Sequence, residues 1–203
     1  MMIFFKERLA YLAVPKTGTT AIERALHRRA SAVFRDPPGI KHTNARGYER
    51  KFRLLFDRSN LAPVETVAIM REPVSWLGSW YRYRQRAALS GHKNSTEGIS
   101  FDRFVEAYLS ETQPDFAKLG SQARFLTDDK GTVLASYVFP YEDFTPFLGF
   151  LKTRLGEEPK LDRVNASPEG NVTLSPSLLA ELKQKHFQDF EIHAQISASE
   201  RTV

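Results

Sequence analysis

The stretch that decides the fold is Ala13-Val14-Pro15-Lys16-Thr17-Gly18-Thr19-Thr20, a small-residue loop that follows the apolar run 9–14. That run has the length and composition of a buried strand. After the loop, Ile22, Ala25 and Leu26 recur at helical spacing, which predicts a helix with one apolar face. A strand, a glycine- and threonine-bearing loop and a helix N-terminus together form an anion cradle, to which Lys16 adds a positive charge. The sequence therefore predicts that residues 15–20 bind a phosphorylated ligand.

A second apolar run, Glu65-Thr66-Val67-Ala68-Ile69-Met70, indicates which phosphorylated ligand this loop takes. In nucleotide triphosphatases the loop reads G-x-x-x-x-G-K-[ST], and an Asp at the end of such a strand holds Mg²⁺. Here Lys16 precedes Gly18, and the second strand is followed by Arg71-Glu72-Pro73. An arginine at this point suits a second phosphate better than a metal ion.

These two segments resemble the nucleotide signatures of sulfotransferases that use 3′-phosphoadenosine 5′-phosphosulfate (PAPS). Residues 15–20 resemble the family's 5′-phosphosulfate loop, P-K-[ST]-G-T-[ST], and residues 71–81 resemble its 3′-phosphate element, R-x-P-x-x-R-x-x-S-x-[YF]. Arg71 and Ser79 match that element at the family's spacing, whereas its middle arginine is Trp76 in this chain. The order of the two motifs, each after a strand candidate, strengthens the match.

The resemblance extends over most of the chain and is closest to the carbohydrate (Golgi-type) sulfotransferases and their short bacterial relatives. Residues 39–43 are similar to the segment that supplies a catalytic histidine in several members, which is His42 here. Residues 122–128 are similar to the family block Q-x-x-[FY]-L-x-D, and residues 137–142, 155–156 and 165–167 follow the family's usual order.

The resemblance implies a role for each residue of the site. It implies a sulfonate transfer from PAPS, without a metal, to a hydroxyl or amine of an acceptor such as a carbohydrate or small molecule. Lys16 would act on the reacting group, and His42 would be the general base, with Glu49 and Asp36 as alternatives among carboxylates. The residues expected to bind the nucleotide donor are Pro15, Lys16, Thr17, Gly18, Thr19, Thr20, Arg71 and Ser79.

Two other function classes stay open on the residues alone. A P-loop-like kinase would use ATP with Mg²⁺, and a non-catalytic module would bind a nucleotide or anion without turnover. Binding of 3′-phosphoadenosine 5′-phosphate without Mg²⁺ favours the sulfotransferase over the kinase, and turnover separates it from the module.

The composition agrees with one globular domain over residues 1–203. The net charge of +5 favours anionic ligands, but the basic residues are dispersed and no nucleic-acid-binding motif is present, so we expect no nucleic-acid partner. The chain has no cysteine and no apolar run long enough to span a membrane. We expect a cytoplasmic bacterial enzyme.

The predicted fold class is α/β, a P-loop-like parallel sheet with helices on both faces, as in sulfotransferases and nucleotide kinases. Both motifs then lie at the carboxyl ends of strands, where such sheets bind ligands. Tryptophan and tyrosine at 76, 80 and 83 have the spacing of a core-facing stripe, and Phe52, Leu54, Leu55 and Phe56 are expected to anchor a polar segment. Strands are expected at 9–14, 31–34, 65–70 and 132–139, and helices after the first loop, from near 73, at 101–111, at 144–155 and from 176.

Overall fold

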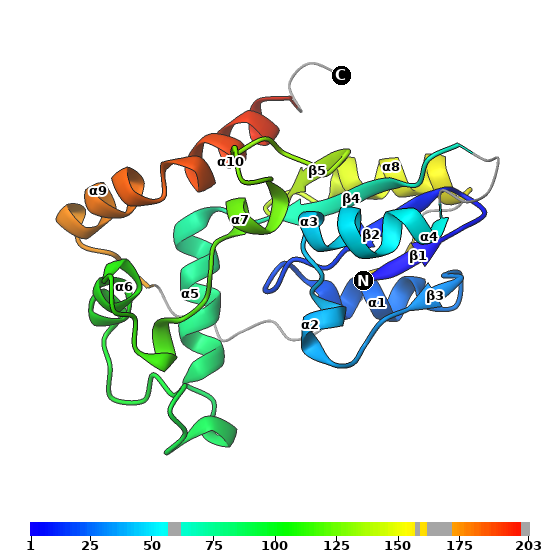
Figure 1. The fold of residues 1–203 in the computed structure, drawn as a ribbon. Coiled ribbons are helices and arrows are strands. Elements are labelled where there is room, and N and C mark those ends of the chain that lie inside the picture. The colour runs from blue at the N-terminus through cyan, green and yellow to red at the C-terminus, as the bar shows by residue number, and fades with distance from the viewer. Residues whose placement is uncertain (57–61, 157–158, 162–171, 200–203) are drawn as a thin grey trace.

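A computed structural model describes residues 1–56, 62–156, 159–161 and 172–199 of the chain (Figure 1). The strands are β1 (Met2–Phe4), β2 (Leu9–Leu12), β3 (Ala32–Val33), β4 (Glu65–Met70) and β5 (Tyr137–Pro140). The helices are α1 (Thr19–Leu26), α2 (Pro38–Lys41), α3 (Ala45–Tyr48), a π-helical turn (Glu49–Arg53), α4 (Leu54–Phe56), α5 (Pro73–Arg84), α6 (Phe101–Leu109), α7 (Gln122–Leu126), α8 (Thr145–Leu155), α9 (Pro176–Lys185) and α10 (Phe187–Ser199). Short 3₁₀ turns lie at Ala87–Leu89 and Asp115–Ala117.

The strands form one mixed five-stranded sheet in the order β3-β1-β2-β4-β5. Strands β2, β4 and β5 are parallel neighbours, as expected, but β1 pairs antiparallel with both β2 and β3. The prediction that the whole sheet is parallel is therefore wrong. The reason is the short connection at residues 5–8, because strands joined by so few residues must turn back on each other.

Helices cover both faces of the sheet, as predicted. Because side chains of a strand alternate between faces, Leu9 and Tyr11 of β2 pack with α1 and α8, whereas Ala10 and Leu12 pack with α3, α7 and α10. All four residues of β2 are buried. The strand that leads into the loop 13–20 is thus fixed from both sides.

A third apolar cluster lies beside the sheet and unites α5, α6 and α9. In Figure 1 these three helices stand to one side of the strands, and α10 leads from α9 back toward β5 and α7. Helix α5 begins directly after β4, with Pro73 at its first turn and the Glu72 carboxylate accepting a hydrogen bond from the Ser75 N–H. One face of α5 packs on α6, and its start adjoins the carboxyl edge of the sheet.

Several predicted elements differ in the structure. The last strand is confined to β5, and the single final helix is divided into α9 and α10 at His186. Phe52 and Phe56 do pack against the core, but Leu54 and Leu55 are exposed, because the segment 45–56 forms short helical turns that direct them to solvent. Strand β1 was not predicted at all.

No helix within the described residues is long and apolar enough to cross a lipid bilayer.

Candidate functional site

The loop after β2 has an unusual backbone. Lys16 and Gly18 both adopt positive φ, at 69° and 75°. Glycine adopts this conformation at little cost, but lysine does not, so the Lys16 backbone is strained by about 1–2 kcal/mol. Gly18 is also the N-cap residue of α1 and provides no side-chain hydrogen bond to the helix. The first turn of α1 is therefore left without a side-chain cap, which is the arrangement in which helix N–H groups bind anions.

The threonines of the loop are placed differently from one another. Thr17 is fully buried, and its hydroxyl donates to the Val14 carbonyl at 2.8 Å. Its side chain therefore shapes the loop, and only its N–H remains for a ligand. Thr19 is at the edge of burial and Thr20 is half-buried, both in the first turn of α1.

Arg71 follows β4 and turns toward α5. Its Nε donates to the Ser75 hydroxyl at 2.8 Å, and its guanidinium carbon lies 4.4 Å from the centre of the Tyr141 ring. Ser79 lies one helical turn beyond Ser75 on the same face of α5. The structure thus places Arg71 beside the face that carries Ser79, but Ser75 is its bonded partner and Ser79 is buried, with 5% of its surface exposed.

The loop and Arg71 meet at Tyr141. Because β2 and β4 are parallel neighbours, their carboxyl ends lie at the same edge of the sheet. A Cβ placed on Gly18 would lie 3.5 Å from the Tyr141 ring, the same ring that the Arg71 guanidinium covers. The two sequence motifs therefore lie close to each other at this edge of the sheet.

Helix α5 holds the loop from its other side. The Trp76 indole N–H donates to the Pro15 carbonyl at 2.9 Å, and the Lys16 ammonium lies 3.9 Å from the centre of the Tyr83 ring and 5.3 Å from that of Trp80. Trp76 is a core residue, as predicted from its spacing. Tyr83 is exposed and faces Lys16, so the core-facing stripe at 76, 80 and 83 does not extend to this residue.

The Lys16 ammonium lies in a positively charged environment. Its pKa is lowered from 10.5 to about 8. Burial is the largest cause, and the positive charges of Arg86, Arg71, Arg82 and Arg84 add to it. A cation that is desolvated and surrounded by other cations gains strongly from an anionic ligand.

His42 ends helix α2 and is tied to the same loop. Its Nδ1 lies 2.7 Å from the carbonyl oxygen of Ala13, the first residue of the loop 13–20. A carbonyl oxygen only accepts hydrogen bonds, so Nδ1 carries the proton and Nε2 keeps a free lone pair. Burial lowers the pKa of His42, although the bond to Ala13 opposes this, so the imidazole is neutral near pH 7.

The two alternative bases are placed less favourably. Glu49 forms an ion pair with Arg53 one turn along the π-helical segment, and Asp36 is exposed before α2. The segment 165–167, which was noted above for its resemblance to sulfotransferases, lies outside the described residues.

Sequence reasoning assigned no role to three residues that contact Arg71. Of the three, only Ser75 lies near Arg71 in the sequence, four residues later, so only its contact could have been predicted from local spacing. Tyr141 follows β5, and Gln122 lies in a block already noted for its resemblance, but their contacts with Arg71 depend on the folded chain.

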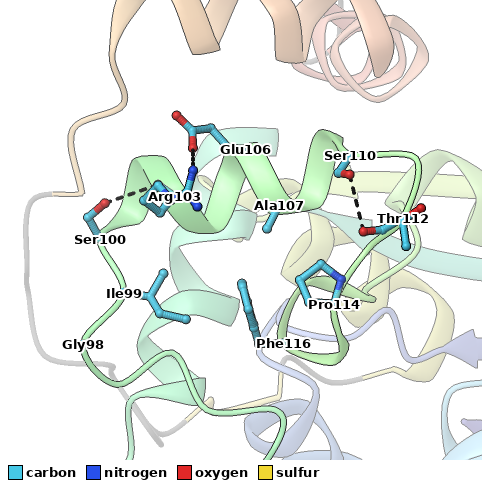
Figure 2. A pocket seen from close by; sticks show the side chains of 10 residues that line it. All are labelled: Gly98, Ile99, Ser100, Arg103, Glu106, Ala107, Ser110, Thr112, Pro114 and Phe116. Atoms are coloured by element: carbon cyan, nitrogen blue, oxygen red, sulfur yellow. Dashed lines mark hydrogen bonds and ion pairs between the residues drawn. The ribbon is translucent and has the colours of Figure 1, made fainter.

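The described part of the chain contains no group of three or more histidine, aspartate or glutamate side chains that would hold a metal ion. It does contain a surface pocket of about 710 Å³ between α6 and the segment that follows it (Figure 2). Ile99 and Phe116 point into this pocket, and Arg103 at its rim pairs with Glu106. Neither the loop residues 15–20 nor Arg71, Ser79 and His42 line this pocket.

Comparison with protein-family models, curated proteins and solved structures finds no match to this chain.

Proposed function

We propose that this protein is a PAPS-dependent sulfotransferase whose parallel strands β2, β4 and β5 form the P-loop-like part of a sulfotransferase fold. The observation that carries the proposal is the meeting of two cationic elements, the loop that contains Lys16 and the residue Arg71, at the carboxyl edge of adjacent parallel strands, where the Tyr141 ring lies against Arg71 and beside Gly18. PAPS carries phosphate at both ends of its ribose. Two separate cationic positions suit that ligand better than a single phosphate chain.

The residues of the loop fit the phosphosulfate end. The uncapped start of α1 offers backbone N–H donors, and the absence of a side chain at Gly18 lets a phosphate approach them closely. The Trp80 indole N–H is buried and makes no hydrogen bond within the described residues, so it too can gain from an acceptor oxygen. The Lys16 ammonium and the Arg84 guanidinium carbon both lie 5.3 Å from the centre of the same ring.

His42 supports the transfer step. PAPS supplies the sulfonate group: a bond forms between the acceptor oxygen and sulfur, and the bond from sulfur to the phosphate oxygen breaks. The acceptor hydroxyl must lose its proton, and His42 Nε2 has the free lone pair to receive it. The leaving phosphate gains negative charge, which Lys16 and the N–H groups of α1 stabilise.

Tryptophan fluorescence provides a direct binding test, because the chain has two tryptophans and both lie beside the loop. We expect 3′-phosphoadenosine 5′-phosphate to change the emission and raise the melting temperature without Mg²⁺. Adenosine 5′-phosphate should bind more weakly, since it lacks the phosphate assigned to Arg71. The Arg71→Ala variant should bind the two nucleotides equally, while the Arg103→Ala variant, changed on α6, serves as the matched control.

Turnover completes the test. Labelled PAPS is incubated with a panel of hydroxyl- and amine-bearing acceptors, and transfer to any of them supports the enzyme. Stabilisation by ATP with Mg²⁺ alone would instead favour the kinase. Nucleotide binding without transfer to any acceptor of the panel, nor to any component of a lysate of the source cell, would favour a non-catalytic module.

A further inference from the structure

The backbone at the end of β4 is held by two side chains from distant parts of the chain. The Gln122 amide accepts a hydrogen bond from the Arg71 N–H at 2.9 Å and donates one to the Arg71 carbonyl at 2.7 Å. The next N–H, that of Glu72, donates to the Glu142 carboxylate at 2.9 Å. Gln122 is 1% exposed, so its two bonds are shielded from water.

Helix α10 forms a hydrogen bond with Glu142 itself and another with Ala123, the residue that follows Gln122. The Asp189 carboxylate accepts from the N–H of Ala123, the residue after Gln122, at 3.0 Å. The His193 imidazole N–H donates to the second oxygen of Glu142, also at 3.0 Å. Asp189 and His193 are one turn apart and share a face of α10, which packs on β5 and α7 in Figure 1.

The two relays are specific to one backbone position. Apolar packing tolerates small shifts, whereas a side-chain amide bonded to both the N–H and the carbonyl of one residue fits only that residue. Ile192 lies between the two relay residues of α10 and is buried in the cluster that contains Met70, the last residue of β4. Movement of α10 would therefore leave the buried Ala123 N–H and the buried Asp189 carboxylate unpaired, which is costly.

We propose that α10 positions Arg71, acting through Asp189 and Gln122 on one side and through His193 and Glu142 on the other. Gln122, Glu142, Asp189 and His193 are positioning residues, because each acts on the ligand through Arg71. The proposal has two parts that are tested separately. The first, called the backbone arm, is that these residues hold the backbone at residues 71 and 72. The second, called the binding arm, is that they thereby support binding of the 3′-phosphate by Arg71, and only this part rests on the proposed function.

The backbone arm is tested by amide hydrogen exchange measured by NMR on the full chain without ligand. Gln122→Met should accelerate exchange at Arg71 and leave Glu72 protected, whereas His193→Leu should accelerate exchange at Glu72 and leave Arg71 protected. The Gln188→Met variant, which removes a different α10 bond, to the Gly131 carbonyl, is the matched control and should change neither. Unchanged exchange at Arg71 and Glu72, or uniform acceleration at all amides, would overturn the proposal.

The binding arm compares affinities for 3′-phosphoadenosine 5′-phosphate and adenosine 5′-phosphate in the same variants. Loss of one or two hydrogen bonds should lower the preference for the 3′-phosphate by roughly 3- to 30-fold in Gln122→Met and by less in His193→Leu. Altered exchange with an unchanged preference would overturn the positioning role. A wild-type protein with no preference would refute the proposed function, while the exchange result still decides whether Gln122 and His193 hold the backbone at residues 71 and 72.

Discussion

Replacing Arg86 with glutamine should raise the pKa of the Lys16 ammonium. Arg86 is the largest charge contribution to the lowered pKa of Lys16, after burial itself. Both cations lie against the ring of Tyr83, with Lys16 Nζ 3.9 Å and the Arg86 guanidinium carbon 4.8 Å from its centre. The substitution removes one of these charges and leaves the ring in place.

The size of the shift follows from the geometry. Since both groups are measured from one ring centre, their charges are at most about 9 Å apart. At that largest separation, Coulomb's law gives a repulsion of at least about 0.5 kcal/mol in water and at least about 1.8 kcal/mol at an effective dielectric constant of 20. These correspond to ~0.3 and ~1.3 pKa units. Arg86 is exposed, so we expect a value in the lower half of that range, and a smaller one at high salt.

Two measurements check this shift. NMR titration of the Lys16 ammonium in the ligand-free protein gives the pKa directly, at about 8 in the wild type. In the proposed enzyme, kcat/KM should fall above that pH, because Lys16 loses the charge that attracts the donor, and Arg86→Gln should move this decline to higher pH. Arg103→Gln on α6 is the control. A wild-type Lys16 that titrates at its ordinary 10.5, or an unchanged value in Arg86→Gln, would refute the reasoning.

Three further predictions concern the same site. Lys16→Ala and Arg71→Ala should each abolish detectable sulfonate transfer with little change in melting temperature; near-normal turnover in either would remove it from the site. His42→Ala should keep nucleotide affinity within a few-fold and lower kcat by roughly 10²–10⁴, and the acid limb of the wild-type profile should lie below the ordinary imidazole pKa because burial lowers that of His42; an unchanged kcat would exclude His42 as the base. Trp76→Phe keeps the aromatic packing but removes the bond to the Pro15 carbonyl, so it should cost about 1–3 kcal/mol in urea unfolding and weaken nucleotide binding; a stability within error of wild type would contradict that role.

The elements with strong local signals could be predicted from the sequence. The loop after β2, the start of α5 near residue 73 and the start of α6 at residue 101 all depend on neighbouring residues, and each lies where expected. The antiparallel β1 could not be predicted, because three residues followed by charged side chains carry no strand signal of their own. Its burial between β2 and β3 is a property of the assembled sheet.

The candidate site shows the same division. Its cations lie at strand ends and helix starts, positions that sequence periodicity identifies. Its connecting residues do not: Tyr141 touches a loop more than a hundred residues earlier, and Gln122 bonds to a backbone that any other residue could have provided. Side-chain bonds to a distant backbone leave no pattern in one sequence, because the partner contributes only its peptide group.

Trp76 is the one position in residues 71–81 that departs from the sulfotransferase signature they resemble, and it shows how the charge around the loop is distributed. An indole in this position is buried and offers a single donor, which the Pro15 carbonyl accepts. An arginine there would bring a charge next to the loop. In this chain two of the nearby charges come two turns or more later, from Arg84 at the end of α5, which lies against Trp80, and from Arg86 just after α5, which lies against Tyr83. Residue 76 therefore fixes where the loop lies, and the end of α5 sets how strongly Lys16 is held as a cation. Changes at 76 should then act on loop geometry and stability, and changes at 86 on the pH dependence, so the two effects can be separated by experiment.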